Sequence, residues 1–152
     1  MKVVISGGSD IGYLCARELA PHHDLFVIEM NAALLERLEQ LDVQIVSGNP
    51  TSLEVLREAQ VSEADFFIAA AHSDEVNIIS SLAVKQLSKA KTFCFVNKAH
   101  YFETFLGELG EHLIIDHLVW PEKLLAEDIS RIITVPGATD IKVFEKDDLK
   151  LL

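Results

Sequence analysis

The residues best suited to chemistry are the glycine-rich turn GGSDIG at Gly7–Gly12 and the acid Glu29. The turn follows a short β-rich run, and Glu29 ends a second apolar run. Gly7 permits a tight turn, and Gly12 lets a following helix pack closely on a sheet. The N-terminus of that helix can bind a phosphate, and an acid about twenty residues further on can accept hydrogen bonds from a ribose diol. This spacing predicts a dinucleotide-binding βαβ unit.

The middle position of the fingerprint departs from the pattern, because Ser9 stands where glycine is usual. The backbone N–H of Ser9 is kept, but its Cβ crowds the approach of a pyrophosphate. Asp10 places a carboxylate near the same site, or else acts as the N-cap of the helix. Two alternatives therefore stay open. Either a mononucleotide or dinucleotide binds here, or the Rossmann scaffold has lost its ligand.

Composition indicates one globular α/β domain, because the chain has 152 residues and 49% of them are hydrophobic. A formal net charge of −11 predicts repulsion of nucleic acid and anionic lipid, so neither is expected as a partner. Cys15 and Cys94 lie in apolar patterns and are predicted to be core thiols. The apolar runs are too short to cross a membrane and no signal peptide precedes the first strand, so we expect a cytoplasmic location without membrane insertion.

Hydrophobic periodicity and turn residues predict six strands that alternate with helices. The expected strands cover 2–6, 25–29, 43–46, 65–71, 92–96 and 113–115, and the expected helices cover 13–20, 32–41, 74–89, 100–109 and 121–133. A short helix after a Thr51–Glu54 capping box and a C-terminal β hairpin at 141–144 and 149–152 complete the set. The alternation predicts a doubly wound parallel sheet of Rossmann type, in the order 3-2-1-4-5-6.

This topology brings the carboxyl ends of the first four strands to one groove. We expect the groove to be lined by Gly7–Gly12, Glu29, Gly48–Thr51 and Ala71–Asp74. The predicted domains are a Rossmann nucleotide-binding domain over 1–134 and a β extension over 135–152.

An oxidoreductase would need a proton-transfer group that faces the cofactor. The sequence has no Tyr-x-x-x-Lys, because the residue four positions after Tyr13 is Arg17 and the residue four positions after Tyr101 is Phe105. It also has no G-x-S-x-G. His72 is the nearest candidate for a general acid, but a turn residue that lines the ligand or solvent is the favoured interpretation. The histidines show no metal-ligand spacing. We expect no catalytic residue and no metal site, and keep a small NAD-dependent oxidoreductase, or a fragment of one, as the alternative.

Several longer motifs occur in an order that resembles a known family. They are GGSDIG, VIE at Val27–Glu29, SGNPT at Ser47–Thr51, SDEVN at Ser73–Asn77, IDHLVWPEKL at Ile115–Leu124 and PGATDIKVF at Pro136–Phe144. Together they resemble the N-terminal nucleotide-binding domain of the regulator-of-potassium-conductance family, also called RCK, KTN or TrkA-N. The resemblance covers essentially the whole chain.

The resemblance implies a regulatory module rather than an enzyme. Such domains dimerise and form rings on the cytoplasmic face of potassium channels or transporters, and the nucleotide that they bind changes gating. The implied cofactor is NAD or NADH, with ATP or ADP as the alternative. The implied partners are a second copy, bound through the helix at 121–133, and a membrane potassium channel or transporter subunit. The full module has a further small lobe after the hairpin, so we expect a truncated chain or a minimal protein.

The resemblance also implies which residues bind the nucleotide. They are the phosphate turn, the ribose acid, a turn near the adenine and the turn after the fourth strand: Gly7, Gly8, Ser9, Asp10, Ile11 and Gly12; Glu29; Gly48, Asn49 and Thr51; and Ala71, His72, Ser73 and Glu75. Ser9, Asn49 and Phe95 stand where the family usually has glycine, an acid and arginine. Ligand identity, and a purely structural module with a dead site, therefore stay open.

Overall fold

The computed structural model describes residues 1–106 and 114–134. It consists of two compact units, Met1–Trp120 and Pro121–Leu152, which are treated separately below. The β hairpin predicted at 141–144 and 149–152, and the β extension predicted at 135–152, lie outside the described residues.

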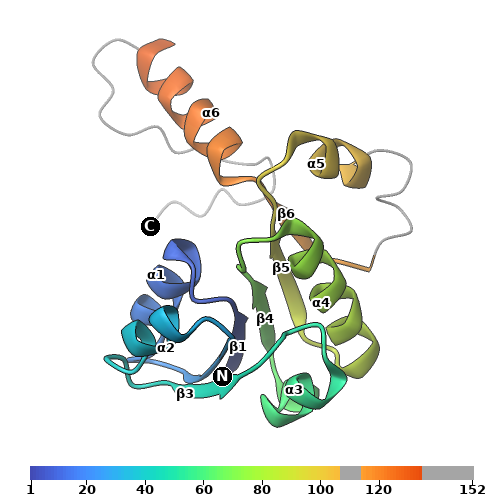
Figure 1. The fold of residues 1–152 in the computed structure, drawn as a ribbon. Coiled ribbons are helices and arrows are strands. Elements are labelled where there is room, and N and C mark those ends of the chain that lie inside the picture. Colours follow the sequence, from blue (N-terminus) through green and yellow to red (C-terminus); the bar gives the residue numbers. More distant parts are fainter. Residues whose placement is uncertain (107–113, 135–152) are drawn as a thin grey trace, which may run out of the picture. The chain divides into compact units, whose positions relative to one another are not determined.

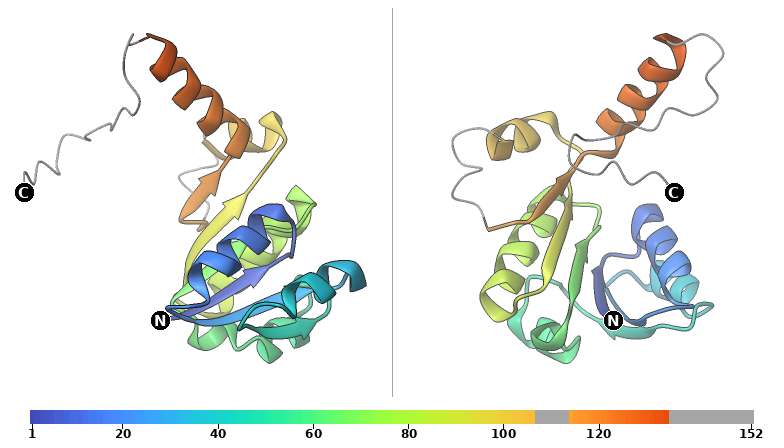
Figure 2. Two further views of the ribbon diagram at one scale, coloured as in Figure 1. Left: turned by 90° about the vertical axis from the view of Figure 1, so that its left-hand side faces the viewer. Right: turned by 180° about the vertical axis from the view of Figure 1, so that it is seen from behind.

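The first unit contains a parallel six-stranded sheet in the order β3-β2-β1-β4-β5-β6 (Figure 1). Its strands are β1 (Lys2–Ser6), β2 (Asp24–Glu29), β3 (Gln44–Ser47), β4 (Phe66–Ala69), β5 (Lys91–Phe95) and β6 (His117–Val119). Figure 2 shows the same sheet from the side and from behind. The predicted doubly wound Rossmann topology is confirmed, and the strand order reverses between β1 and β4.

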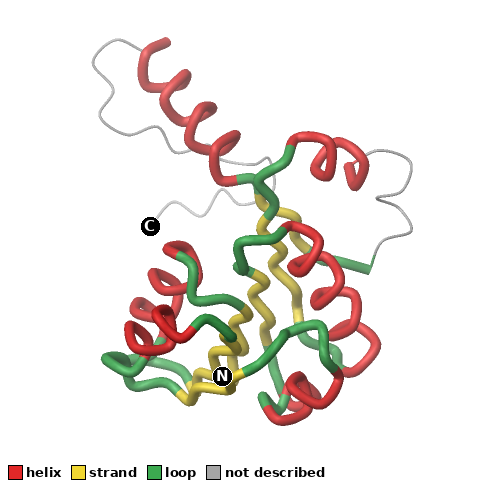
Figure 3. The backbone as a smooth tube through the Cα atoms, in the orientation of Figure 1, coloured by secondary structure: helices red, strands yellow, loops and turns green. Residues whose placement is uncertain are grey.

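Helices cover both faces of this sheet, which explains why its strands are apolar on both sides (Figures 1 and 3). Val3 and Ile5 of β1 pack with the α1 and α2 side, whereas Val4 packs with the α3 and α4 side. The helices of the first unit are α1 (Asp10–Leu19), α2 (Ala32–Leu38), α3 (Leu53–Glu58), the 3-10 turn η1 (Val61–Glu63), α4 (Asp74–Leu87) and α5 (Ala99–Leu106).

Two expected helix starts were wrong in detail. Helix α1 begins at Asp10 rather than Tyr13, and its N-cap is Ser9 rather than Asp10, because the Ser9 hydroxyl accepts the N–H of Gly12 at 3.4 Å. The capping box predicted at Thr51 does not form. Ser52 is the N-cap of α3, without a side-chain cap bond, because the Thr51 hydroxyl donates to Asn49 Oδ1 instead.

The sixth strand was predicted at Leu113–Ile115, but β6 begins at His117. Asp116 fixes this start. Its Oδ2 accepts the Thr92 N–H at 2.7 Å, and its own N–H donates to Thr92 Oγ1 at 3.0 Å. Lys85 Nζ lies 3.0 Å from the same carboxylate oxygen. Burial raises the pKa of Asp116, but these hydrogen bonds and the Lys85 charge outweigh it and lower that pKa overall.

Helix α6 (Pro121–Thr134) is the described part of the second unit, and it contains no buried residue. Its large apolar side chains are 46–74% exposed: Leu124, Leu125, Ile129, Ile132 and Ile133. Trp120, just before this helix, packs against the core of the first unit, with the centre of its ring 5.6 Å from that of Phe102. Among the described residues, no helix has both the length and the apolar character needed to cross a bilayer.

Candidate functional site

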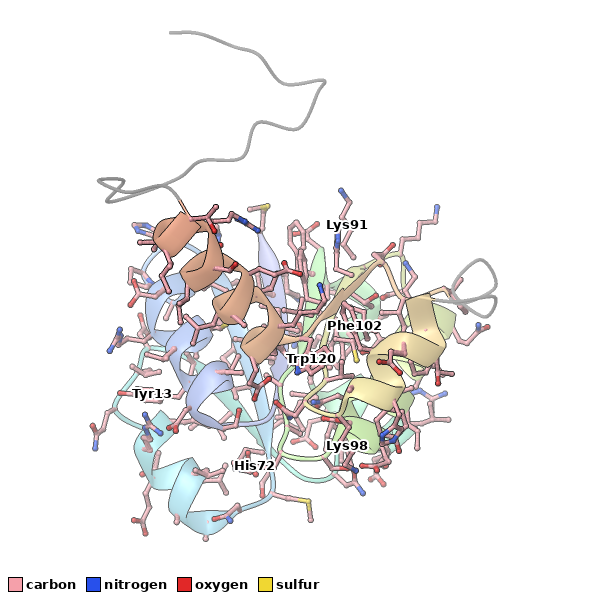
Figure 4. All side chains as sticks on the ribbon, turned by 90° about the horizontal axis from the view of Figure 1, so that it is seen from above. Tyr13, His72, Lys91, Lys98, Phe102 and Trp120 are labelled. Atoms are coloured by element: carbon pink, nitrogen blue, oxygen red, sulfur yellow. The ribbon has the colours of Figure 1, made fainter. Side chains whose placement is uncertain are left out.

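Two hollows lie at the carboxyl ends of the strands and share Ala71 and His72. The β5 hollow, of about 200 Å³, is lined by Ser9–Ile11, residues 70–72, Phe95 and Asn97. The β2 hollow, of about 270 Å³, is lined by Gly7, residues 28–31, Leu34, Asn49, Pro50, residues 71–73 and Val76. Figure 4 looks down on this end of the sheet, with His72 labelled. The hollows therefore flank the point where the strand order reverses, which is where doubly wound folds bind ligands.

The glycine turn leaves no room for a side chain at Gly7 or Gly12. Gly7 has φ +100°, and a Cβ there would lie 2.5 Å from the Cα of Ala71. A Cβ on Gly12 would lie 2.0 Å from the carbonyl oxygen of Gly7. Both glycines therefore shape the turn, and only Gly7 lines a hollow.

Ser9 has a structural role that its sequence position did not reveal. Its hydroxyl donates to the carbonyl oxygen of Ala70 at 2.6 Å, while it caps α1. This contact ties the turn to β4. The N–H groups in the first turn of α1 are then the donors that a phosphate can reach.

Glu29 is only 8% exposed, and backbone N–H groups surround its carboxylate. Its Oε2 accepts the Gly8 N–H at 2.6 Å, and its Oε1 accepts the N–H groups of Met30 and Asn31 at 2.7 and 2.8 Å. A carboxylate has about four acceptor positions, so one position on Oε2 stays open for a ribose hydroxyl. The acid thus links the phosphate turn to the start of α2, in addition to its predicted role.

In the turn after β3, only one of the three predicted residues faces a hollow. Asn49 lines the β2 hollow, and its Oδ1 accepts both the N–H and the hydroxyl of Thr51, at 3.0 and 2.9 Å. Thr51 and Gly48 line neither hollow. They shape the turn that presents Asn49 and Pro50.

After β4, Ser73 lines the β2 hollow and caps α4, with its hydroxyl 3.3 Å from the N–H of Val76. Glu75 lines neither hollow and binds toward α5 instead, because it accepts from Lys98 Nζ at 2.7 Å and from the Tyr101 hydroxyl at 2.8 Å. The hydrogen bond from Lys98, followed by that from Ser73, lowers the pKa of Glu75 well below its usual range. The same contacts with Glu75 raise the pKa of Lys98 and of Tyr101.

Asp74 and Asn77 line neither hollow but bind the backbone of residues that do. Asp74 was expected in the lining of the groove, and Asn77 was not predicted at the site. Asp74 is buried and accepts the N–H groups of Asn97 and Lys98 at 3.0 and 2.9 Å. Asn77 is fully buried, accepts the Ala71 N–H at 2.7 Å, and donates to the carbonyl oxygens of Ala71 and Phe95, each at 2.9 Å. A signal was present in the sequence, since both residues belong to the SDEVN motif.

The described part of the chain holds no group of three or more His, Cys, Asp or Glu side chains that could bind a metal ion. Cys94 is buried, and burial raises its pKa to about 12, so its sulfur stays protonated at neutral pH.

Residues 3–121 match the TrkA-N domain. This chain belongs to the TrkA-N family. It is 35% identical to a Trk system potassium uptake protein TrkA homolog of Archaeoglobus fulgidus, over 100% of this chain and 35% of the relative. It is 34% identical to a TrkA homolog of Methanothermobacter thermautotrophicus, over 100% of this chain and 69% of that relative. The TrkA-N chain thus spans about a third of the first relative and about two thirds of the second.

Among solved structures, the GsuK channel bound to NAD has a TM-score of 0.67 and 25% identity, over 82% of this chain and 22% of that one. A structure of GsuK bound to ADP has a TM-score of 0.66 and 26% identity, over 82% of this chain and 32% of that one. The predicted family is therefore confirmed.

Proposed function

We propose that this TrkA-N chain is a nucleotide-binding regulatory domain of a potassium transport system. The observation that carries the proposal is the pair of hollows that meet at Ala71 and His72, beside the N-terminus of α1. Support comes from the family and from relatives that are named as TrkA potassium uptake proteins.

The ligand is NAD or NADH, with ATP or ADP as the alternative. In this arrangement the adenosine occupies the β2 hollow beside Glu29, and the phosphates lie on the turn at Gly7–Gly12. The second half of a dinucleotide reaches the β5 hollow. The similar GsuK structures bound to NAD and to ADP support this range of ligands.

The ligand acts by binding two states of an assembly with different affinity, rather than as a reactant. A ligand bound at the crevice can affect α5 through the start of α4. Asp74 and Glu75 begin α4, and they bind Lys98 and Tyr101, in the segment before α5 and in α5 itself. The chain forms a homodimer or a higher ring through the exposed apolar side chains of α6, and a membrane potassium channel or transporter subunit keeps it at the cytoplasmic face.

Calorimetric titration of the purified chain with NAD, NADH, ADP and ATP tests the binding step. His72 is exposed and lines both hollows, so His72→Ala should weaken binding by about fivefold, a change worth about 1 kcal/mol. The matched control is His22→Ala, which removes an exposed histidine in the turn before β2 and should leave affinity unchanged.

Absence of binding for all these nucleotides at millimolar concentration would contradict the proposal. An incubation with NADH and a panel of carbonyl compounds separates the two functions, since steady NADH oxidation would favour the small oxidoreductase. Potassium uptake is then compared between cells that carry only the unmodified chain and cells that carry only the His72→Ala chain. If uptake responds to nucleotide equally in both, the regulatory role is contradicted.

A further inference from the structure

The phosphates of a nucleotide in the proposed site meet acidic side chains but no basic one in the lining of the hollows. Among the described residues that line the two hollows, Asp10 and Glu29 are acids, and none is a lysine or an arginine. Backbone N–H groups already bind the Glu29 carboxylate. The N-terminus of α1 contributes the equivalent of about half an elementary charge. A cationic side chain beside the turn would therefore strengthen the binding of phosphate.

Helix α2 brings an arginine to this turn. A Cβ atom on Gly8 would lie 3.3 Å from the Cβ of Leu34 and 3.1 Å from Cδ1 of Leu38, so this part of α2 packs directly on the turn. Arg37 precedes Leu38 and lies one helical turn after Leu34, which itself lines the β2 hollow. Its side chain therefore begins close to the phosphate turn.

Two residues of α1 hold the guanidinium of Arg37 at the N-terminal end of that helix. Its Nη1 donates to Asp10 Oδ1 at 2.8 Å, and its Cζ lies 3.8 Å from the centre of the Tyr13 ring. Asp10 and Tyr13 are three positions apart, so they share one side of α1. An arginine has five N–H donors and the bond to Asp10 uses one of them, so others can reach a phosphate oxygen.

Lys98 is another cation near the crevice, but its contacts hold it away from the ligand. Its Nζ lies 2.7 Å from Glu75 Oε1 and 5.4 Å from the centre of the Tyr101 ring. Glu75 lines neither hollow, whereas Asp10 lines the β5 hollow. Of these two cations, Arg37 is therefore the one whose acidic partner lies at the site.

We propose that Arg37 binds the phosphate groups of the nucleotide, and that Asp10 and Tyr13 hold its guanidinium in place for this contact. The inference rests on the proposed nucleotide-binding function and adds the residue that supplies positive charge to that site. A planar guanidinium can donate two parallel hydrogen bonds to a phosphate, and both NAD and ADP carry such a group. A charge-assisted contact of this kind corresponds to about a tenfold gain in affinity.

Arg37→Gln tests the contact directly. Calorimetric titration of the full chain with ADP and with NAD should show about tenfold weaker binding than the unmodified chain. The Arg37 side chain is 39% exposed, so the fold should be kept, and circular dichroism checks this. The matched control is Arg17→Gln, which removes an arginine that pairs with Glu18 in the last turn of α1 and lines neither hollow. It should leave the affinity unchanged.

A second comparison separates binding of the phosphate from neutralisation of Asp10. In Asp10→Asn there is no carboxylate left to neutralise, while Tyr13 still holds the guanidinium. If Arg37 binds phosphate, adding Arg37→Gln to Asp10→Asn should still weaken ADP binding by about tenfold. If Arg37 only neutralises Asp10, the double variant should bind ADP as tightly as Asp10→Asn alone.

The second of these results, or equal affinities of Arg37→Gln and the unmodified chain, overturns the inference and leaves nucleotide binding standing. If the unmodified chain binds neither ADP nor NAD, the proposed function fails and the inference fails with it.

Discussion

Replacing Asn77 with alanine should lower the free energy of unfolding by about 3 kcal/mol. The side chain is fully buried and makes three hydrogen bonds, to the N–H and carbonyl of Ala71 and to the carbonyl of Phe95. An intramolecular hydrogen bond contributes about 1 kcal/mol net, and a buried donor left without a partner costs about 1–3 kcal/mol. The loss therefore exceeds about 3 kcal/mol if no water enters the space, and falls toward about 2 kcal/mol if one does.

Urea denaturation followed by circular dichroism measures this change, provided that the slope of the transition is unaltered. The matched control is Asn49→Ala, which deletes the same atoms from an exposed turn and should cost less than about 1 kcal/mol. Because Ala71 lines both hollows, Asn77→Ala should also weaken nucleotide binding under conditions where it stays folded. A difference of less than about 0.5 kcal/mol from the control would refute the role assigned to Asn77.

Other perturbations address the ligand, the assembly and pH. The carboxylate of Glu29 should repel a 2′-phosphate, so NAD should bind at least about tenfold, or about 1.4 kcal/mol, better than NADP; equal affinities in calorimetry would contradict this. Ile129→Glu should give a folded monomer with its nucleotide site intact, because it places a charge on the apolar side chains of α6; sedimentation tests this, and an unmodified chain that is monomeric at high micromolar concentration refutes the dimer. Glu75 has a lowered pKa, so its stabilising contacts with Lys98 and Tyr101 are complete above its ordinary value of 4.5 and are lost as pH falls below it; in Glu75→Gln, acid denaturation should show a shallower loss of stability in this range.

Most of the sheet could be predicted from sequence, because buried parallel strands are locally apolar. The strands β1, β2 and β4 stand out as the runs KVVIS, LFVIE and DFFIAAA, each bounded by turn residues. The exception is β6, whose three residues are too few to show a period. Its position depends on the pairing of Asp116 with Thr92, and these residues are 24 positions apart. A local sequence pattern cannot predict a contact between residues so far apart in the chain.

The same distinction separates the predicted part of the site from the part that was missed. The turn at Gly7–Gly12 and the acid Glu29 follow from local spacing within one βαβ unit. By contrast, the partners of Asp74 lie more than twenty positions away, in the segment after β5. The direction of Glu75 is set in the same way by Lys98. Sequence marked these acids as part of a motif, but only the fold shows that they hold the crevice together.

The contacts of these acids explain how a chain with a net charge of −11 can offer a site to an anion. Glu29 and Asp74 accept backbone N–H groups, and Glu75 pairs with Lys98. Asp10, beside the phosphate turn, pairs with the guanidinium of Arg37 at 2.8 Å.

Tyr13 strengthens that last pair, because the Arg37 guanidinium lies 3.8 Å from the centre of its ring. Among the described residues, each of these acids at the crevice therefore binds a backbone N–H group or a cationic side chain. Since a phosphate responds to the local field at short range rather than to the distant net charge, these partners and the α1 N-terminus decide whether it binds.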